Sequence, residues 1–460
     1  MSYLDLSQNN FEGINIPNFL GYLESLNYLN LSFSLFTGVI PPHLGNLSKL
    51  QYLDLNSNSV LFPEYFPVRR LEVKSLQWLV GLPSLKYLDM SLVNIGEVKP
   101  DWLQAVNMLP SLLELDLSGC GLVTLPQSIS SINFTSLTFL DISYNLFNSS
   151  IPYWLSNLSG LSILNIRSSS LRGAIPNAFA NLVSLRELDL SNNFNIEGQL
   201  PVGLGHLTNL SSLDLSRNNI TGKIPFSFGK LCNLQTFALT GNGISGEITE
   251  FVDGLSQCSN SKLESLLLDS NRLLGGELPY SLGALKMLKT LHLEYNSFWG
   301  SIPDSIGNMS SLQELYLSGN MFNGTISKSV GKLPMLTVLD LSDNHWKGVL
   351  TEAHFQNLTR LSYLYLSVDS ATWSLVLDVK HDWVPPFNLS IAIFDNVLIG
   401  PNFPAWLQTQ TELWSLQLTN VGISDTIPQG FWNSFSRISD ISLSKNKFED
   451  RYHTSNLILI

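Results

Sequence analysis

The chain has 460 residues, and its 25 lysines and arginines against 37 aspartates and glutamates give a formal net charge of −12. This charge argues against a nucleic-acid-binding protein, which needs many basic side chains to displace counterions, and against docking on anionic lipid. Hydrophobic residues make up 44% of the chain, which supports a large core and excludes a disordered protein. Because no run of about 18 apolar residues occurs, no transmembrane segment is expected.

A single repeat fills the chain from its first residues to its last. Its central phrase is Leu-x-Leu, with Phe, Ala or Ile replacing a leucine in some copies, and successive copies most often start 24 or 25 residues apart. This period is typical of solenoids, in which each unit buries its apolar face only against the next. The eighteen copies start at Leu4, Leu29, Leu53, Leu88, Leu115, Leu140, Leu164, Leu188, Leu213, Phe237, Leu266, Leu291, Leu315, Leu339, Leu364, Ala392, Leu416 and Ile441.

The most complete copy runs from Leu210 to Pro225. Leu213 and Leu215 alternate with Asp214, which predicts a short strand with two leucines pointing inward and one polar residue pointing outward. Gly222 permits an unusual backbone angle, and Pro225 fixes φ on the return segment. We therefore expect an α/β-type solenoid: a right-handed superhelix of about 18 repeats with a parallel β-sheet on its concave face and little regular helix.

An asparagine follows the predicted strand in most copies, at the point where the chain turns away from the sheet. Its amide both donates and accepts, so it can satisfy backbone groups that are buried at that turn. Stacked copies should form an asparagine ladder. Its members are Asn9, Asn58, Asn145, Asn193, Asn218, Asn242, Asn271, Asn296, Asn320, Asn344 and Asn446.

We expect one domain over residues 1–460, with three departures from the period. An irregular insert is expected at about 59–81, and irregular connections at about 249–262 and 367–389; none is long enough for a separate domain. Neither end shows the polar cap that a solenoid needs, and the first ten residues lack the basic start and apolar stretch of a signal peptide. The chain is therefore expected to be a piece of a longer reading frame.

No string of catalytic residues is present, so we expect neither an enzyme nor a cofactor. The segment Gly241-Asn-Gly-Ile-Ser-Gly246 matches the dinucleotide-binding pattern, but its glycines fall in the ordinary repeat turn and Asn242 is a ladder position. The seven histidines are scattered without metal-ligand spacing, so no metal site is expected either.

The three cysteines are too few for a small disulfide scaffold. Cys232 and Cys258 lie in consecutive repeats, so stacking could bring them within disulfide reach, and two free thiols are the alternative. Cys120 takes the ladder place of its repeat and is expected to be a buried thiol.

Acceptor strings for N-glycosylation are frequent because Asn-Leu-Ser belongs to the repeat itself, so their number is weak evidence for secretion. One of them, at Asn30, lies within a predicted strand. The candidates outside the strands are Asn46, Asn133, Asn148, Asn157, Asn209, Asn219, Asn308, Asn323, Asn357 and Asn388.

The outward residue of the predicted strand changes character along the chain. In the first nine copies it is always Asp or Asn, whereas later copies introduce aromatic side chains. Exposed aromatics on a rigid sheet are typical of protein-recognition hot spots, although aromatic residues also simply tolerate strand positions. The candidate ligand-binding residues, counting flanking outward positions, are His292, Tyr316, Asp340, Tyr363, Tyr365 and Trp414.

Several segments resemble a known family. Phe36-Thr-Gly-Val-Ile-Pro41 and Phe298-Trp-Gly-Ser-Ile-Pro303 resemble the repeat of plant extracellular leucine-rich-repeat proteins. Outside that consensus, Leu231-Cys-Asn-Leu234 and the segments 244–255 and 403–413 resemble plant receptor-like proteins of the fungal-xylanase-receptor type.

The resemblance implies a fragment of the ligand-binding ectodomain of a plant receptor-like protein, on the extracellular side of the plasma membrane, in defence or developmental signalling. It implies a protein or peptide ligand and a receptor kinase as signalling partner of the full-length protein, with no nucleic acid and no membrane contact by this segment. The alternatives are a secreted inhibitor of microbial cell-wall-degrading enzymes and a truncated, non-functional receptor fragment.

Overall fold

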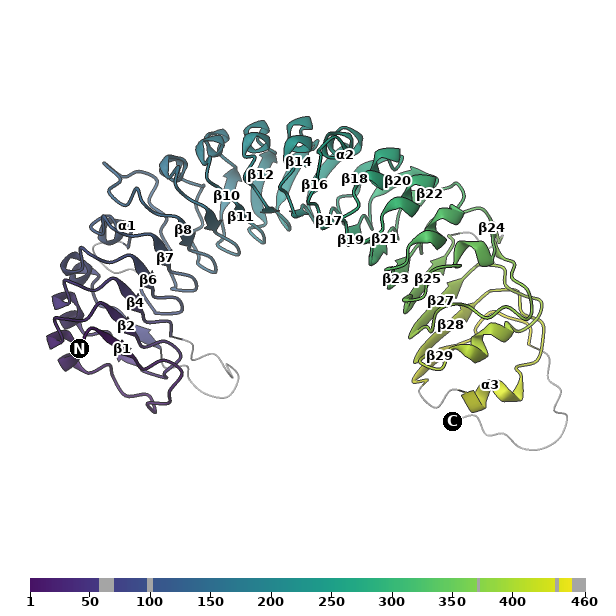
Figure 1. Ribbon diagram of the computed structural model, residues 1–460, viewed down its shortest axis with the longest axis horizontal. Coiled ribbons are helices and arrows are strands. Elements are labelled where there is room, and N and C mark those ends of the chain that lie inside the picture. Colours follow the sequence, from purple (N-terminus) through teal and green to yellow (C-terminus); the bar gives the residue numbers. More distant parts are fainter. Residues whose placement is uncertain (58–69, 97–101, 370–372, 435–437, 449–460) are drawn as a thin grey trace. The chain divides into compact units, whose positions relative to one another are not determined.

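The computed structural model describes residues 1–57, 70–96, 102–369, 373–434 and 438–448. The chain forms two compact units, residues 1–221 and 222–460, and each is described here by itself. Both are solenoids of the predicted kind, in which a parallel sheet lines the inner side of each unit's curve and short helices lie on the outer side (Figure 1).

The sheet of the first unit takes one short strand from each repeat. Neighbouring strands pair in parallel and in chain order, with the central leucines opposite one another, as for Leu4 and Leu29. The strands are β1 (Tyr3–Asp5), β2 (Tyr28–Asn30), β4 (Tyr52–Asp54), β6 (Tyr87–Asp89), β7 (Glu114–Asp116), β8 (Phe139–Asp141), β9 (Ile163–Asn165), β11 (Glu187–Asp189) and β13 (Ser212–Asp214).

The sheet of the second unit continues the same pattern within that unit. Leu266, Leu291 and Leu315 lie opposite one another on successive parallel strands. The strands are β15 (Thr236–Ala238), β17 (Ser265–Leu267), β19 (Thr290–His292), β21 (Glu314–Tyr316), β23 (Val338–Asp340), β25 (Tyr363–Ser367), β27 (Ile391–Asp395), β28 (Ser415–Thr419) and β29 (Asp440–Ser442).

Shorter parallel ladders form after the turn that leaves the main sheet. In the first unit they are β3 (Gly38–Val39) with β5 (Leu71–Glu72), and β10 (Arg172–Ala174) with β12 (Asn195–Gln199) and β14 (Asn219–Gly222). In the second unit they are β16 (Gly243–Glu247), β18 (Leu273–Gly276), β20 (Ser297–Gly300) and β22 (Met321–Phe322), and β24 (Gly348–Leu350) with β26 (Leu375–Leu377).

The outer side of each unit consists mainly of 3-10 turns, and many of them directly follow the repeat proline, whose φ is −63° at Pro225. The turns are η1 (Asn18–Tyr22), η2 (Pro42–Asn46), η3 (Gln77–Gly81), η4 (Tyr153–Asn157), η5 (Asn177–Asn181), η6 (Val202–His206), η7 (Phe226–Lys230), η8 (Tyr280–Ala284), η9 (Asp304–Asn308), η10 (Lys328–Lys332), η11 (Glu352–His354) and η12 (Ala405–Thr409). Among the described residues the α-helices are α1 (Trp102–Val106), α2 (Thr249–Ser256) and α3 (Gln429–Ser434). The expectation of little regular helix is therefore confirmed.

The core of each unit is the stack of repeat leucines. Leu213 and Leu215 are both 0% exposed, whereas Asp214 between them faces outward and is half-buried. Phe237 replaces the strand leucine in its repeat and packs against Phe228 and Phe251, with ring centroids 5.8 and 5.0 Å apart. Burial of successive aliphatic layers is thus what holds the repeats together.

The asparagines after the strands bond to the backbone of their own and the preceding repeat. The Nδ2 of Asn218 donates to the carbonyl oxygens of Leu215 and Leu190, at 2.9 and 3.0 Å. The residue before this asparagine, Arg217, has a φ of 55°, so the amide fixes a turn that an L-residue rarely adopts. Bonds of this kind are also made by Asn145, Asn193, Asn271, Asn296, Asn320, Asn344 and Asn446. Asn9 and Asn242 likewise donate to carbonyl oxygens of their own repeats, and Asn58 lies outside the described residues.

The three departures from the period fold differently from one another. Of the insert expected at about 59–81, residues 58–69 lie outside the described residues, whereas β5 and η3 fold as an ordinary return segment from Leu71 onward. The connection expected at 249–262 contains α2, and the one at 367–389 contains β26. Among the described residues, no helix is both long enough and apolar enough to cross a bilayer.

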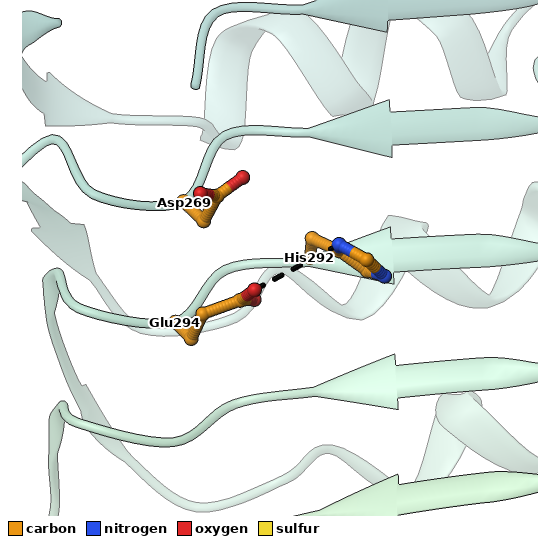
Figure 2. Close-up of side chains that lie close together, drawn as sticks. All are labelled: Asp269, His292 and Glu294. Atoms are coloured by element: carbon orange, nitrogen blue, oxygen red, sulfur yellow. Dashed lines mark ion pairs between the residues drawn. The ribbon is translucent and has the colours of Figure 1, made fainter. Parts of the chain in front are cut away.

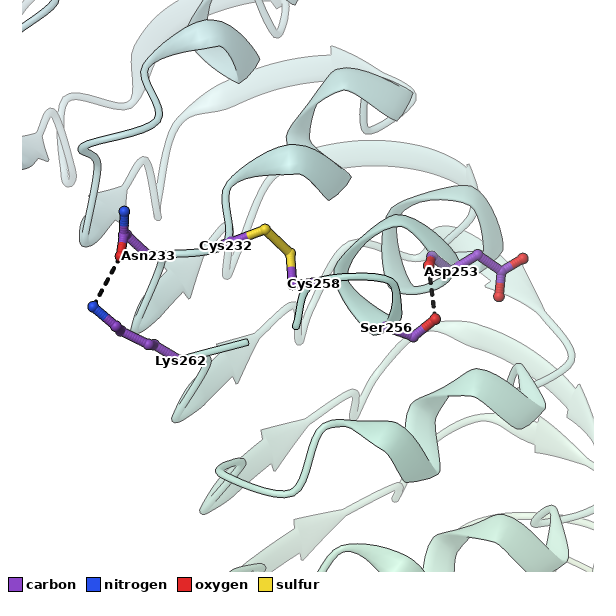
Figure 3. The surroundings of a disulfide bond; sticks show 6 residues. All are labelled: Cys232, Asn233, Asp253, Ser256, Cys258 and Lys262. Carbon is purple, nitrogen blue, oxygen red and sulfur yellow. Dashed lines mark hydrogen bonds between the residues drawn. A yellow bond between two sulfur atoms is a disulfide. The ribbon is translucent and has the colours of Figure 1, made fainter. Parts of the chain in front are cut away.

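A disulfide joins Cys232 and Cys258, whose Cα atoms are 5.7 Å apart (Figure 3). It links the segment after η7 to the end of α2, where Gly229 and Gly254 meet backbone to backbone. A Cβ atom on Gly229 would lie 2.9 Å from the Cα of Gly254, so this close approach requires glycine. Cys120 is buried, with its Sγ 3.1 Å from the carbonyl oxygen of Met90.

Candidate ligand-binding surface

The outward carboxylates of the first unit are occupied by bonds within their own repeats. Asp89 Oδ1 accepts from the backbone N–H of Ser91 at 2.8 Å and from its hydroxyl at 2.6 Å. Asp141 and Ser143 repeat this arrangement. The serine two residues beyond the aspartate thus offsets part of the repulsion between stacked carboxylates.

Burial changes the charge of this row of carboxylates. It raises the pKa of Asp54 to about 6 and that of Asp116 to about 7, and repulsion from Asp89 adds to both shifts. By contrast, the exposed Asp5 has its pKa lowered by hydrogen bonds from Ser7. Part of the row is therefore protonated near neutral pH, and the inner face of this unit is less negative than its sequence indicates.

A second feature of the first unit is a stack of tyrosines at the first position of four successive strands. Ring centroids of Tyr3, Tyr28, Tyr52 and Tyr87 are 4.2, 4.2 and 4.1 Å apart, and the rings are nearly parallel. The central outward residue of each strand does not reveal this stack, which was not predicted. The signal was present, because a tyrosine precedes the strand leucine in each of these copies.

The structure brings together most of the candidate residues of the second unit. His292, Tyr316, Asp340 and Tyr365 lie opposite one another on the neighbouring strands β19, β21, β23 and β25, and all four are half-buried. The ring of His292 meets that of Tyr316 edge-on, with centroids 4.5 Å apart. These residues form one continuous row on the inner side of the unit.

The two flanking candidates lie at different distances from this row. Tyr363 opens β25 and is half-buried, so it lies on the same strand as Tyr365. Trp414 immediately precedes β28, is 45% exposed, and is separated from β25 by β27. We call His292, Tyr316, Asp340, Tyr363 and Tyr365 the aromatic patch, and Trp414 lies beside it.

Local electrostatics keep Tyr316 and Tyr365 of the aromatic patch uncharged. Burial and the carboxylate of Glu314 raise the pKa of Tyr316, and burial and Asp340 raise that of Tyr365. Both hydroxyls therefore stay protonated and can donate to a ligand. Rigid aromatic side chains with a polar end are the residue type most enriched at protein-binding hot spots.

A mixed cluster that was not predicted shares His292 with the aromatic patch. Asp269, His292 and Glu294 each offer one possible metal-ligand atom, and these atoms lie within 4.8 Å of one another (Figure 2). No metal site was expected because the histidines lack metal-ligand spacing along the sequence. In the structure, stacking brings residues of consecutive repeats together. Burial and the charges of Asp269 and Asp340 raise the pKa of Glu294 to about 7.

All ten of these glycosylation candidates are exposed, as a glycan acceptor must be, including Asn219, which the structure places at the start of β14. Asn30 differs, because it is only 9% exposed and its Oδ1 accepts from the backbone N–H and hydroxyl of Ser32. A glycan on the strand at Asn30 is thus incompatible with this packing, and glycosylation at the other ten positions remains a prediction.

Models of leucine-rich repeats match most of the chain. A leucine-rich repeat region matches residues 259–427, and a leucine rich repeat model matches residues 1–60 and 135–194. A further leucine rich repeat model matches residues 111–132, 184–207 and 209–231.

Three proteins illustrate what this chain is similar to. It is 36% identical to "Receptor-like protein EIX1" of Solanum lycopersicum, over 98% of this chain and 44% of that protein, so it spans less than half of that relative. A second similar protein is the solved ectodomain of the plant membrane receptor kinase GASSHO1/SCHENGEN3 from Arabidopsis thaliana, in complex with CASPARIAN STRIP INTEGRITY FACTOR 2. Its sequence is 31% identical to this chain and the TM-score is 0.76, and the match covers 94% of this chain and 52% of that one. The PEPR1–AtPEP1 structure is 27% identical with a TM-score of 0.76, covering 97% and 62%.

Proposed function

The chain belongs to the plant leucine-rich-repeat receptor-like proteins, and from this premise we propose that it is the ligand-binding part of a cell-surface receptor. In this proposal it recognises a protein or peptide in defence or developmental signalling, on the outer side of the plasma membrane. It catalyses no reaction itself, and a receptor kinase transmits the signal. Support comes from the solved ectodomains, which are bound to CASPARIAN STRIP INTEGRITY FACTOR 2 and to AtPEP1.

The observation that carries the proposal is the aromatic patch. Its residues lie on neighbouring strands of one sheet, so their positions are fixed before any ligand arrives. A preformed surface loses little side-chain entropy on binding, and its half-buried tyrosines offer both apolar area and a hydroxyl donor. Such residues provide a large share of the affinity in protein interfaces.

Two probes test this function: a purified fungal xylanase, which the resemblance to xylanase receptors suggests, and a panel of synthetic secreted plant peptides. Binding of each to the immobilised chain is measured by interferometry. We expect the double variant Tyr316→Ala/Tyr365→Ala to weaken binding of any probe that binds by tenfold or more, because two hot-spot tyrosines together contribute about 2 kcal/mol or more. The matched control is Tyr153→Ala/Tyr280→Ala, which removes two exposed tyrosines of the outer turns.

The outcomes separate the possible functions. A receptor binds its probe without changing the catalytic rate of the enzyme, whereas inhibition of the bound xylanase supports a secreted inhibitor of wall-degrading enzymes. Equal loss in both double variants contradicts a ligand site at the aromatic patch. Binding of neither probe by the correctly folded chain contradicts the proposal as stated and favours a non-functional fragment.

A further inference from the structure

Two adjacent repeats of the second unit exchange the usual polar pair at the end of the strand. Many other repeats place an aspartate on the strand and a serine two residues later, as in Asp340 and Ser342, where the serine bonds to the carboxylate. In these two repeats, Asp269 stands two residues after the outward Leu267, and Glu294 stands two residues after the outward His292. Asp395, two residues after Ile393, shows the same exchange in a later repeat. The carboxylates have moved two residues along the chain, and the serines that would bond to them are absent.

The exchange brings two carboxylates and an imidazole together. Figure 2 shows Asp269 and Glu294 after neighbouring strands, with the ring of His292 beside them. His292 Nδ1 lies 3.7 Å from Glu294 Oε1, and one ligand atom from each residue falls within 4.8 Å of the others. Zinc bonds of about 2.0–2.2 Å bring neighbouring ligand atoms to roughly 3–4 Å from one another, so only small side-chain rotations are needed.

A fourth residue orients the imidazole. Glu314 Oε2 lies 3.3 Å from His292 Nε2, on the side of the ring away from Nδ1. A proton on Nε2 that is donated to Glu314 leaves the lone pair of Nδ1 directed at the carboxylates. Histidines that bind metals usually donate their other N–H to a carboxylate in this way.

One carboxylate oxygen in the cluster has no partner among the described residues. Glu294 Oε2 is buried and accepts no hydrogen bond from any of them, which is rare for a buried polar atom. Asp395, at the same place in its own repeat, provides the contrast, because both of its oxygens accept from Gln417 Nε2, at 2.9 and 2.8 Å. Asp269 is in turn held by the hydroxyl of Thr240 at 2.6 Å. A cation would satisfy the oxygen that the protein leaves unbonded.

We propose that Asp269, His292 and Glu294 bind a divalent transition-metal ion on the inner face of the second unit, with Glu314 as the positioning residue for His292. One nitrogen and two carboxylate ligands favour Zn²⁺ over Mg²⁺ or Ca²⁺, which prefer oxygen alone. Three protein ligands leave a coordination position open on the same surface as the aromatic patch. The metal site does not depend on the receptor function proposed above.

Titration calorimetry of the chain with Zn²⁺ near neutral pH tests the site, with Mg²⁺ and Ca²⁺ titrated separately. We expect one Zn²⁺ per chain and much weaker binding of the other two ions. His292→Gln should weaken Zn²⁺ binding by 100-fold or more, and Glu314→Gln by about 10- to 100-fold. The matched control is His345→Gln, whose histidine also has one carboxylate nearby, Asp369 at 3.8 Å, but belongs to no three-residue group among the described residues.

Thermal unfolding provides a second readout. Zn²⁺ should raise the melting temperature of the wild-type chain and of His345→Gln, but not that of His292→Gln. Circular dichroism without metal checks that each variant folds. If His292→Gln does not fold, Asp269→Asn takes its place in both experiments. Absence of Zn²⁺ binding by the wild-type chain overturns the proposal, as does equal affinity in His292→Gln or preference for Mg²⁺ or Ca²⁺.

Discussion

Replacing Asn193 with alanine should lower the free energy of unfolding of the first unit by about 3 kcal/mol or more, because several buried backbone groups lose their partners at once. Its Oδ1 accepts from the N–H groups of Ser169 and Leu171, at 3.0 and 2.9 Å. Its Nδ2 donates to the carbonyl oxygens of Ile166 and Leu190, at 2.9 and 2.8 Å. Asn193 itself is 1% exposed, so water cannot replace these bonds without opening the turn.

The matched control for this variant is Asn195→Ala, two residues away on β12 and exposed. Its effect should stay within about 0.5 kcal/mol. Urea unfolding measures both variants, and hydrogen exchange locates the damage, which should centre on the repeats around β9 and β11 because coupling in a solenoid runs mainly between neighbours. Equal effects of the two substitutions would show that the ladder does not stabilise the turns.

The first unit should become less stable as the pH rises from about 4 to about 7. Burial raises the pKa of Asp116 to about 7 from its ordinary value of 3.8. Between these two values the folded chain holds a proton that the unfolded chain has released, so the stabilisation is complete below the lower value and is lost as the pH rises through the higher one. Asp116 alone should account for roughly 2–4 kcal/mol.

The variant Asp116→Asn isolates this contribution. Asparagine keeps an oxygen for the backbone N–H of Ser118, which bonds to Asp116 Oδ1 at 2.8 Å, but carries no charge. Its unfolding free energy should therefore depend less on pH and exceed that of the wild-type chain above neutral pH. The control is Asp5→Asn, at the same repeat position but exposed and with a lowered pKa, which should leave this pH dependence in place. Stability that rises with pH across the window contradicts the account.

The regular part of the fold followed from the sequence because one physical requirement recurs in every repeat. Each Leu-x-Leu phrase must bury its leucines, so its period places the strands and the outward residues. The asparagine turns were predictable for the same reason, because buried backbone groups at each turn need partners. Leu213, Leu215 and Asn218 are accordingly all buried. The return segment after Leu71 has no Gly-x-Ile-Pro phrase, so the repeat pattern alone does not predict its β5 and η3.

The contacts that depend on stacking were harder to predict. The pairing of His292 with Glu314 requires the register of β19 and β21, and its approach to Asp269 requires that of β17 and β19, which no single repeat contains. The burial of Asn30 likewise depends on the bond from Ser32 and on neighbouring strands. Two features are visible in the sequence when the repeats are compared position by position. One is the tyrosine stack, and the other is the replacement of the usual Asp–Ser pair by Leu267 with Asp269 and by His292 with Glu294.

Hydroxyl-radical footprinting of the chain, with and without whichever xylanase or peptide probe binds it, tests most directly whether the aromatic patch is the ligand-binding surface. Oxidation of Tyr316 and Tyr365 should fall several-fold on binding, because the ligand covers them. Oxidation of Tyr280 on η8 and of Trp299 on β20, both exposed in the free chain, should not change. Protection of Tyr280 or Trp299, with Tyr316 and Tyr365 oxidised as before, would contradict this assignment.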